Sequence, residues 1–480
     1  MKGKIALLAV CVLAGAAVWA NHSVAADDVD GKVDAFVQDE LHRQRIPGAA
    51  VGVYRDGKLT KAQGYGLANV EWDAAVTPDT IFQSGSVGKQ FTATAVMMLA
   101  EEGRVGLDDP IKKYFPDAPD TWNDIKVHNL LSHTSGLSEY ETGARTKVGG
   151  PFYLRLDYTE DELYKRITGM PMDFKPGEDW SYRNTNYVLL GILIHKVTGN
   201  FYGDFLQERI FRPLGMSRTR IISEADIIPR RSAGYQLVKG ELKNQDWVSP
   251  SLNSTADGAL YFTVGDLQKW DAALYTEKLL KKASLDRMWT VEKLNNGKPN
   301  KANYGFAWEI NSVNGHRVIE HGGAWQGFTT YIARYVDDRL TVVALTNLDS
   351  GHSNPKKITT GVAAIYNPAL KPVEEKPIED KEPQVTQMVK DLWREIVDGR
   401  AKPERFTEEA QKQLFPDEMQ ELGPALKEFG ELKALELMER TEEGERRNYR
   451  YRAKFPNLTL MISVGLTKDN KIARLNFSEE

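Results

Sequence analysis

The chain has 480 residues, of which 41% are hydrophobic and 27% are charged. This length exceeds what one hydrophobic core usually spans, so the sequence predicts at least two domains. The composition lies within the globular range and excludes a chain that is disordered throughout. The 62 basic and 67 acidic residues give a net charge of -5, which favours neither nucleic acid nor an anionic membrane surface as a partner. A small molecule or a peptide is the expected partner.

Residues 1–26 have the pattern of a signal peptide. Lys2 and Lys4 precede the uncharged stretch 5–20, and small residues follow at Ala25 and Ala26. The alternative is a membrane anchor, but this stretch is shorter than the roughly twenty residues that span a bilayer. We therefore expect an exported protein, periplasmic or secreted, with no stable membrane span after cleavage. Cys11 would be lost with the signal peptide, which excludes disulfides and thiolate metal sites from the mature chain.

Residues 27–366 are expected to form one α/β (α+β) domain. Apolar helices are predicted from Ser86 to Glu102 and from Tyr187 to Val197, each followed by a glycine. An early pair of strands turns at Asp56-Gly57. Later strands are predicted at 304–310, 317–321, 328–335 and 340–347, and they form an antiparallel meander that shares one sheet with the first pair. The expected architecture is an antiparallel sheet flanked by helices, with a helical subdomain.

Residues 367–383 have the composition of a solvated linker, with prolines among Glu and Lys and few apolar side chains. Beyond it, 384–480 begins with helical segments and continues with four strand patterns, which predicts a small α+β domain. This tail contains no histidine and no nucleophile in a recognisable setting, so we assign it no chemistry.

Ser86-Val87-Gly88-Lys89 is an SxxK sequence at the start of a predicted helix. The three-residue spacing places the hydroxyl and the amine on one helix face. A serine hydroxyl becomes a good nucleophile when a base removes its proton, and a buried lysine can be that base. The backbone NH of Ser86 is then a candidate oxyanion donor. Ser353 to Lys356 also fits SxxK, so the tetrapeptide alone is weak evidence.

Tyr182-Arg183-Asn184 stands just before the second apolar helix. Its phenol could relay a proton to a leaving group, and its amide could bind a substrate carbonyl. Ordinary loop capping is the alternative, and it would be favoured if this triplet stood alone.

His321-Gly322-Gly323-Ala324 lies at the end of a predicted strand. Glycines there permit close backbone approach, so the strand edge could pair with an extended substrate, and the NH of Ala324 could complete an oxyanion hole. A capped surface histidine is the alternative for His321. His316 and Glu320-His321 do not have the spacing of helical zinc sites, so we expect no metal. His133 lies in a loop rich in local hydrogen-bonding residues, and we interpret it as structural.

Several ordered segments together resemble the serine beta-lactamase and penicillin-binding protein superfamily, in particular its class C, esterase and DD-peptidase branch. They are FQSGSVGKQFT (82–92), GRVGLDDP (103–110), VHNLLSHTSGL (127–137), PGEDWSYRN (176–184), PLGM (213–216) and HGGAWQGF (321–328). The tail resembles, more weakly, the small α+β domains appended to some relatives.

The resemblance implies Ser86 as nucleophile, Lys89 as general base, Tyr182 as acid/base partner and Asn184 as the holder of the substrate amide. His321, Gly323 and Ala324 would line the substrate strand. Two departures stand out. His321 replaces the lysine of a KTG segment, and Arg183 occupies a place where serine is common, where it could crowd the cleft or restore a cation.

The sequence therefore predicts a serine hydrolase that works through an acyl-enzyme on Ser86 without a cofactor. Loss of a permanent cation at His321 should weaken recognition of a substrate carboxylate, which favours an ester or a small D-amino-acid peptide or amide. A class C-like beta-lactamase and a penicillin-binding sensor that never turns over are the alternatives.

Overall fold

The computed structural model describes residues 29–141, 152–373, 375–415, 417–427, 429–456 and 459–479. The predicted signal peptide lies outside the described residues. The chain divides into two units, Met1–Leu237 with Leu242–Pro372, and Val238–Glu241 with Val373–Glu480. The first unit extends past residue 366 because Leu370 is fully buried in its core. Within the described ranges, no helix is both long enough and apolar enough to cross a bilayer.

The first unit is built on a seven-stranded sheet of order β3-β2-β1-β12-β11-β10-β9, and its neighbouring strands are antiparallel. The sheet joins strands from both ends of the unit, because β1 pairs with β12 from Ala49 opposite Thr346 to Arg55 opposite Leu340. The strands are β1 (Gly48–Arg55), β2 (Lys58–Asn69), β3 (Ala74–Ala75), β9 (Glu309–Val313), β10 (His316–Trp325), β11 (Phe328–Tyr335) and β12 (Leu340–Thr346).

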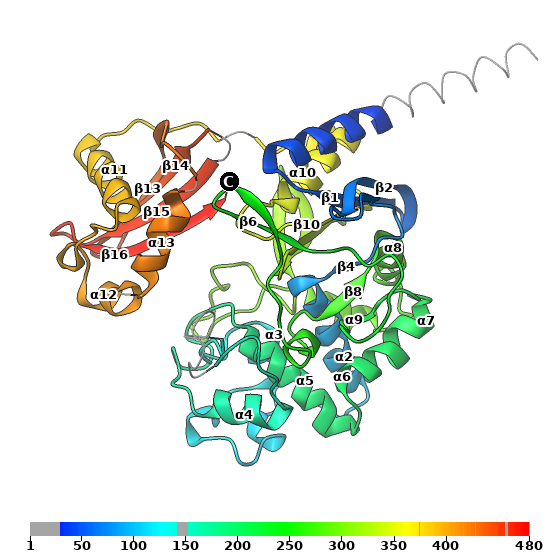
Figure 1. The fold of residues 1–480 in the computed structure, drawn as a ribbon. Helices are drawn as coiled ribbons and strands as arrows, with labels where there is room; N and C mark the ends of the chain where they lie inside the picture. The colour runs from blue at the N-terminus through cyan, green and yellow to red at the C-terminus, as the bar shows by residue number, and fades with distance from the viewer. Residues whose placement is uncertain are drawn as a thin grey trace, which may run out of the picture. The chain divides into compact units, whose positions relative to one another are not determined.

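Both faces of this sheet are buried, which explains why its central strands are apolar throughout. In β1, Ala49, Val51 and Val53 face one core cluster, while Ala50 and Tyr54 face another. The helix at 29–44 and α10 (Pro355–Tyr366) cover the first face. The second face packs against the helical region that contains α2 (Lys89–Glu101) and α5 (Asn184–Thr198) (Figure 1). This arrangement confirms the antiparallel sheet flanked by helices.

Local sequence signals set several element boundaries. Asp56 and Gly57 adopt positive φ values of 53° and 69°, as a two-residue hairpin turn requires. Helix α5 ends at Gly199, which is left-handed with a φ of 77°. The other helices are α3 (Val127–Leu131), α4 (Glu160–Thr168), α6 (Tyr202–Leu206), α7 (Arg212–Leu214), α8 (Val264–Ala273) and α9 (Lys282–Met288), and the small strands are β4 (Phe82–Gln83), β5 (Arg220–Ile221), β6 (Tyr235–Val238), β7 (Glu241–Asn244) and β8 (Leu260–Phe262).

Three expected elements differ from those observed. The helix expected from Ser86 begins as a 3₁₀ turn, η1 (Gly85–Gly88), and becomes α-helical at Lys89. The strand expected at 304–310 starts only at Glu309, because the side chain of Asn300 bonds the backbone of Tyr304 and holds it in a loop. Strand β10 continues past His321 to Trp325, because its glycines pair regularly with β11.

The second unit is a four-stranded antiparallel sheet in chain order, packed on helices. Its core includes Trp393 and Ile396 from one helix and Tyr451 and Ile462 from the sheet. The elements are α11 (Pro383–Val397), α12 (Glu408–Leu414), α13 (Asp417–Lys427), β13 (Ala434–Glu443), β14 (Arg446–Lys454), β15 (Thr459–Leu466) and β16 (Ile472–Glu479).

Candidate active site

Ser86 and Lys89 form the centre of a buried polar cluster. Ser86 lies on the 3₁₀ turn, and Lys89 is the first residue of α2. The Nζ atom of Lys89 is 3.0 Å from Ser86 Oγ and 2.8 Å from Asn184 Oδ1, and it also donates to the carbonyl oxygen of Asp257. Lys89 is fully buried and has no carboxylate within ion-pair distance among the described residues. The geometry thus places an amine beside a hydroxyl, away from a carboxylate counterion.

Tyr182 completes one side of this cluster. The Nζ atom of Lys89 lies 5.1 Å from the centre of the Tyr182 ring. The Tyr182 hydroxyl is buried and makes no hydrogen bond of normal geometry with the described residues. Burial raises the pKa of Tyr182, and the nearby Lys89 and Ser86 oppose that rise. A buried phenol without a settled partner is available for a group that enters the site.

Asn184 and Arg183 have different surroundings although they are neighbours. Asn184 is the first residue of α5, where its side-chain oxygen accepts from Lys89 and its backbone NH donates to Glu139 Oε2 at 2.8 Å. The guanidinium of Arg183 is turned to Asp173, with nitrogens 2.9 and 3.1 Å from Oδ2. Its charge is therefore compensated by a carboxylate.

Strand β10 approaches the turn that carries Ser86 very closely. A Cβ atom on Gly85, whose φ is 49°, would lie 2.5 Å from the nitrogen of Ala324. A Cβ atom on Gly323 would lie 2.3 Å from the carbonyl oxygen of Ser84 and 2.9 Å from the nitrogen of Ser86. Glycine is required at both places because a side chain would separate the turn from the strand. The backbones of Ser86 and Ala324 are thereby brought together.

The same part of β10 has a strand neighbour on one side only. Strand β9 pairs with β10 over 316–320, whereas β11 pairs with β10 over 318–325. The edge from His321 to Trp325 therefore has no ladder partner on the β9 side within the described part of the chain. Such an edge can pair with an extended ligand.

His321 is buried, and both of its ring nitrogens are occupied. Nδ1 lies 2.6 Å from the carbonyl oxygen of Gly322, which only accepts, so Nδ1 carries the proton. Nε2 then accepts from the Tyr304 hydroxyl at 2.8 Å. Burial lowers the pKa of His321 to about 4, and the charge of Lys89 acts in the same direction. The ring is neutral near pH 7.

The ring of His133 packs against the ring of Tyr182, a contact that the sequence did not predict. The two rings are 4.3 Å apart between centroids, and Nδ1 accepts from the backbone NH of Arg183. Burial is the main cause that lowers the pKa of His133 well below its usual range, and the charge of Lys89 acts in the same direction. The neutral ring supports the Tyr182 loop, which fits the structural role expected for it.

Glu139 is a second residue that sequence reasoning missed. It follows the loop of His133, and its carboxylate accepts from the NH of Asn184. Burial is the main cause that raises the pKa of Glu139 to about 7, and the neighbouring Glu141 adds to the rise. An acidic residue shortly after a Ser/Thr-rich loop was a weak signal, because such residues are usually solvated.

Other candidate residues lie elsewhere or form no site. Ser353 of the second SxxK sequence bonds to Thr329 and Thr346, while Lys356 is turned to Glu320, so these two are not a pair. His316 is paired with Asp338. Across the described ranges no group of three or more His, Cys, Asp or Glu side chains is arranged to hold a metal ion.

A sheet buried on both faces, with a serine and a lysine at the start of the helix behind it, defines the class of penicillin-recognising serine hydrolases. The family model named Beta-lactamase matches residues 33–366, and the chain belongs to this family. It is a serine hydrolase related to beta-lactamases and penicillin-binding proteins.

The relatives cover different shares of the chain. Penicillin-binding protein 4* of Bacillus subtilis is 29% identical over 343 residues, which are 68% of this chain and 73% of that protein. Protein flp of Staphylococcus aureus is 26% identical over 328 residues, which are 68% of this chain and 64% of that protein. An octameric penicillin-binding protein homologue from Pyrococcus abyssi has a TM-score of 0.63 and 25% identity, and covers 94% of this chain and 95% of its own.

A D-amino acid amidase from Ochrobactrum anthropi SV3 is also similar to this chain. Its structure has a TM-score of 0.60 and 25% identity, and covers 72% of this chain and 98% of its own. These likenesses confirm the superfamily that the ordered segments indicated.

Proposed function

We propose that the protein hydrolyses an ester or a small D-amino-acid peptide or amide through an acyl-enzyme on Ser86. The observation that carries this proposal is the 3.0 Å contact between Lys89 Nζ and Ser86 Oγ inside a buried cluster that also holds Asn184. A nucleophile beside its base, with an amide oriented on the base, is the arrangement that covalent catalysis requires.

In this mechanism Ser86 Oγ attacks the substrate carbonyl carbon while its proton passes to Lys89. The NH groups of Ser86 and Ala324 receive the negative charge that develops on the carbonyl oxygen. The bond to the leaving group breaks as Tyr182 donates a proton to it, and Lys89 restores the tyrosine proton. A water molecule then attacks the ester on Ser86 and releases the acid. Gly323 keeps the strand close enough for the two NH groups to act together.

The charges around the site support a substrate without a carboxylate at the position where beta-lactams carry one. Arg183 is neutralised by Asp173, and His321 is neutral with a pKa of about 4. We therefore assign His321 to holding Tyr304 and shaping the substrate strand. The similarity to a D-amino acid amidase and to a D-stereospecific amidohydrolase from Streptomyces also favours a small amide.

A second candidate is a penicillin-binding protein that is acylated and does not turn over. The names of the Bacillus subtilis and Pyrococcus abyssi relatives favour it. A class C-like beta-lactamase is a third possibility that the family allows. We also propose that the chain is exported, and that 384–480 is a separate domain with no part in the chemistry.

Intact-protein mass after separate exposure to penicillin and to a short activated ester tests the proposal. We expect an adduct that maps to Ser86, turnover of the ester and little hydrolysis of penicillin. Ser86→Ala should abolish both the adduct and the turnover. Unchanged hydrolysis by this variant would remove Ser86 from its role, and a long-lived penicillin adduct without ester turnover would favour the second candidate.

A further inference from the structure

Trp325 is the last residue of β10, and its indole is held by a buried side chain. The indole NH donates to Asn253 Oδ1 at 2.7 Å. Asn253 is itself fixed, because its backbone NH and its side-chain amide donate to the carbonyl oxygens of Ser249 and Val248. The indole nitrogen is the only polar atom of the Trp325 side chain, so the part of the ring that remains exposed is apolar.

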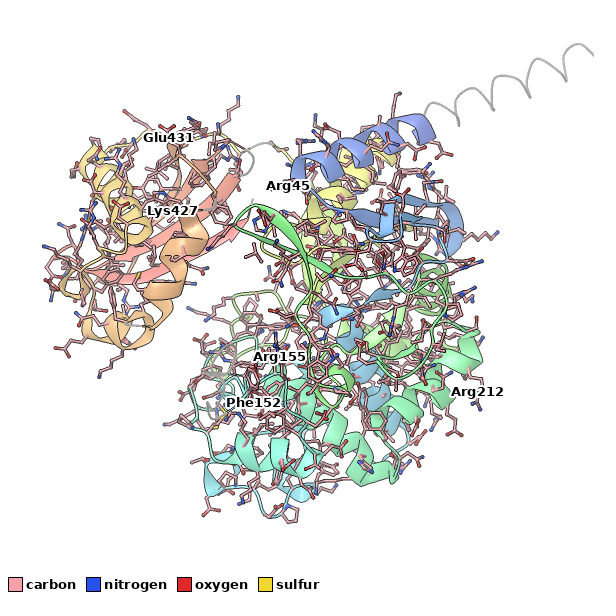
Figure 2. All side chains as sticks on the ribbon, viewed as in Figure 1. Arg45, Phe152, Arg155, Arg212, Lys427 and Glu431 are labelled. Atoms are coloured by element: carbon pink, nitrogen blue, oxygen red, sulfur yellow. The ribbon has the colours of Figure 1, made fainter. Side chains whose placement is uncertain are left out.

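The segment that carries Asn253 is bonded to its surroundings on both sides of that residue. Before it, the NH of Ser249 donates at 2.9 Å to the carbonyl oxygen of Leu154, in the segment on which Figure 2 labels Arg155. After it, the carbonyl oxygen of Asp257 accepts from the buried amine of the proposed base. The indole is therefore anchored to a segment that also contacts the reacting centre.

Trp325 shares one face of β10 with His321 and Gly323. Side chains two residues apart point to the same face of a strand, and β10 pairs regularly with β11 as far as Trp325. Gly323 marks the place where this face meets Ser86, because a Cβ atom on Gly323 would lie 2.9 Å from the Ser86 nitrogen. At roughly 3.4 Å per residue, His321 and Trp325 lie about 7 Å to either side of that place.

The two sides of Ser86 would receive different parts of a substrate. Tyr182, the proposed donor of a proton to the leaving group, lies on the side of His321, with 6.1 Å between the two ring centroids. The leaving group and the acyl chain diverge from the carbonyl carbon that is attacked. A substrate whose leaving group is directed to Tyr182 therefore extends its acyl chain along β10 toward Trp325.

We infer that Trp325 binds a flat apolar group on the acyl side of the substrate. The preferred substrates then carry an aromatic ring close to the carbonyl that Ser86 attacks, as in esters or amides of an arylacetic acid or of an aromatic amino acid. This inference rests on the proposed function and narrows its substrate class. Trp325 acts in it as a specificity-determining residue.

The same ring also contributes to the core, and the test has to separate the two roles. Trp325 packs against a small cluster of buried residues that includes Ile222 and Tyr261. Loss of the ring therefore has a cost in stability, and a defect in folding lowers activity on every substrate alike. A contact with the acyl chain lowers activity only on substrates that have the aromatic group.

The test compares p-nitrophenyl acetate with p-nitrophenyl phenylacetate, which share a leaving group and differ in the acyl chain. Each kcat/KM is divided by the rate constant for alkaline hydrolysis of the same ester, which removes the difference in intrinsic reactivity. For the unaltered protein we expect a corrected kcat/KM about tenfold higher for the phenylacetate, the size of an aromatic contact with its buried area. Trp325→Ala should lose most of that preference, while kcat/KM for the acetate stays within about threefold.

Two further variants keep apolar volume at this position. Trp325→Phe retains a ring and should retain part of the preference. Trp325→Leu fills the space against the core, so its unfolding midpoint should stay close to that of the unaltered protein, whether or not Trp325→Ala folds. The preference for the phenylacetate should nevertheless fall by about threefold or more in Trp325→Leu, because the flat ring is gone.

Trp72→Ala is the matched control. Trp72 is 81% exposed on the turn between β2 and β3, at the edge of the sheet opposite to β9 and β10. The preference for the phenylacetate should persist in that variant.

Trifluoroethyl phenylacetate shows which end of the substrate meets Trp325, because its leaving group has no ring. The loss in Trp325→Ala should be as large with this ester as with p-nitrophenyl phenylacetate, and a loss that disappears would place Trp325 at the leaving group and overturn the inference. An unaltered protein without the preference, or an equal loss on acetate and phenylacetate in Trp325→Leu, would also overturn it. Failure of both p-nitrophenyl esters to acylate Ser86 would instead overturn the proposed function.

Discussion

The two units of the chain treat polar side chains in opposite ways. Around Ser86 and among the described residues, the first unit buries Lys89 without a carboxylate at ion-pair distance, leaves the Tyr182 hydroxyl without a hydrogen bond of normal geometry and gives Glu139 a raised pKa. In the second unit, Glu382 accepts from Arg440, Arg447 and Tyr449, and its pKa is lowered. One cluster is incomplete and buried, and the other is paired and near the surface.

The difference indicates where the fold tolerates a loss of stability because the residues serve a reaction. Buried polar groups without partners cost stability, so a fold retains them where they meet a ligand or a reacting group. Paired surface charges contribute little and have little effect on reactivity. This contrast supports the proposal that the chemistry belongs to the first unit and that the cluster around Glu382 is structural.

Removal of the Lys89 side chain should have the largest effect on activity. Lys89→Ala should lower kcat/KM for an ester substrate by about 10³-fold, because it removes the base and leaves Asn184 Oδ1 without its donor. Lys356→Ala is the control, since this lysine belongs to the second SxxK sequence and is half exposed beside Glu320. Steady-state kinetics checks the prediction, and an equal loss in both variants would contradict it.

Tyr182→Phe should give the next largest effect. The hydroxyl makes no hydrogen bond of normal geometry with a described residue, so its removal should leave the unfolding midpoint nearly unchanged while kcat falls about 10²-fold. Thermal melts and single-turnover kinetics measure the two quantities separately. A marked drop in the midpoint with unchanged kcat would mean that the phenol serves folding.

Acid should destabilise the first unit through its neutral histidines. The pKa of His321 is about 4 in the folded protein, below its unfolded value near 6.5, so the unfolded state takes up the proton first. The free energy of unfolding should therefore fall between pH 6.5 and 4, by up to about 1.4 kcal/mol per pH unit for each such histidine. Denaturant titrations at several pH values measure this dependence. In His321→Gln the free energy of unfolding should fall less steeply with decreasing pH, and an unchanged pH dependence would contradict the lowered pKa of His321.

The smallest effect is expected in the second unit. Glu382→Gln weakens the contacts to Arg440 and Arg447, which should lower the unfolding midpoint of that unit slightly. The loss of stability should be small, because a surface ion pair contributes less to the free energy of unfolding than a buried one. kcat/KM for the ester should stay within about twofold of its value in the unaltered protein. A large loss of activity would show that the tail takes part in catalysis.

Local patterns in the sequence were enough to predict the contact at the centre of the candidate site. The spacing of Ser86 and Lys89 on one helix predicts their contact, because residues three apart are neighbours on a helix face. Glycines after the two apolar helices predict where α2 and α5 end, and Gly103 and Gly199 do have positive φ values. The short run 328–335, which ends before the turn at Asp337-Asp338, predicts β11 closely, because turn residues are a local signal as well.

Contacts between distant segments were decided only by the tertiary structure. Glu139 bonds the backbone of Asn184 across 45 residues, and Tyr304 reaches His321 from a loop that the sequence pattern assigned to a strand. A carboxylate or a histidine has the same sequence signature whether it is solvated or buried. Burial and neighbouring charge shift the pKa values of Glu139 and His321, and both depend on which segments the fold packs together.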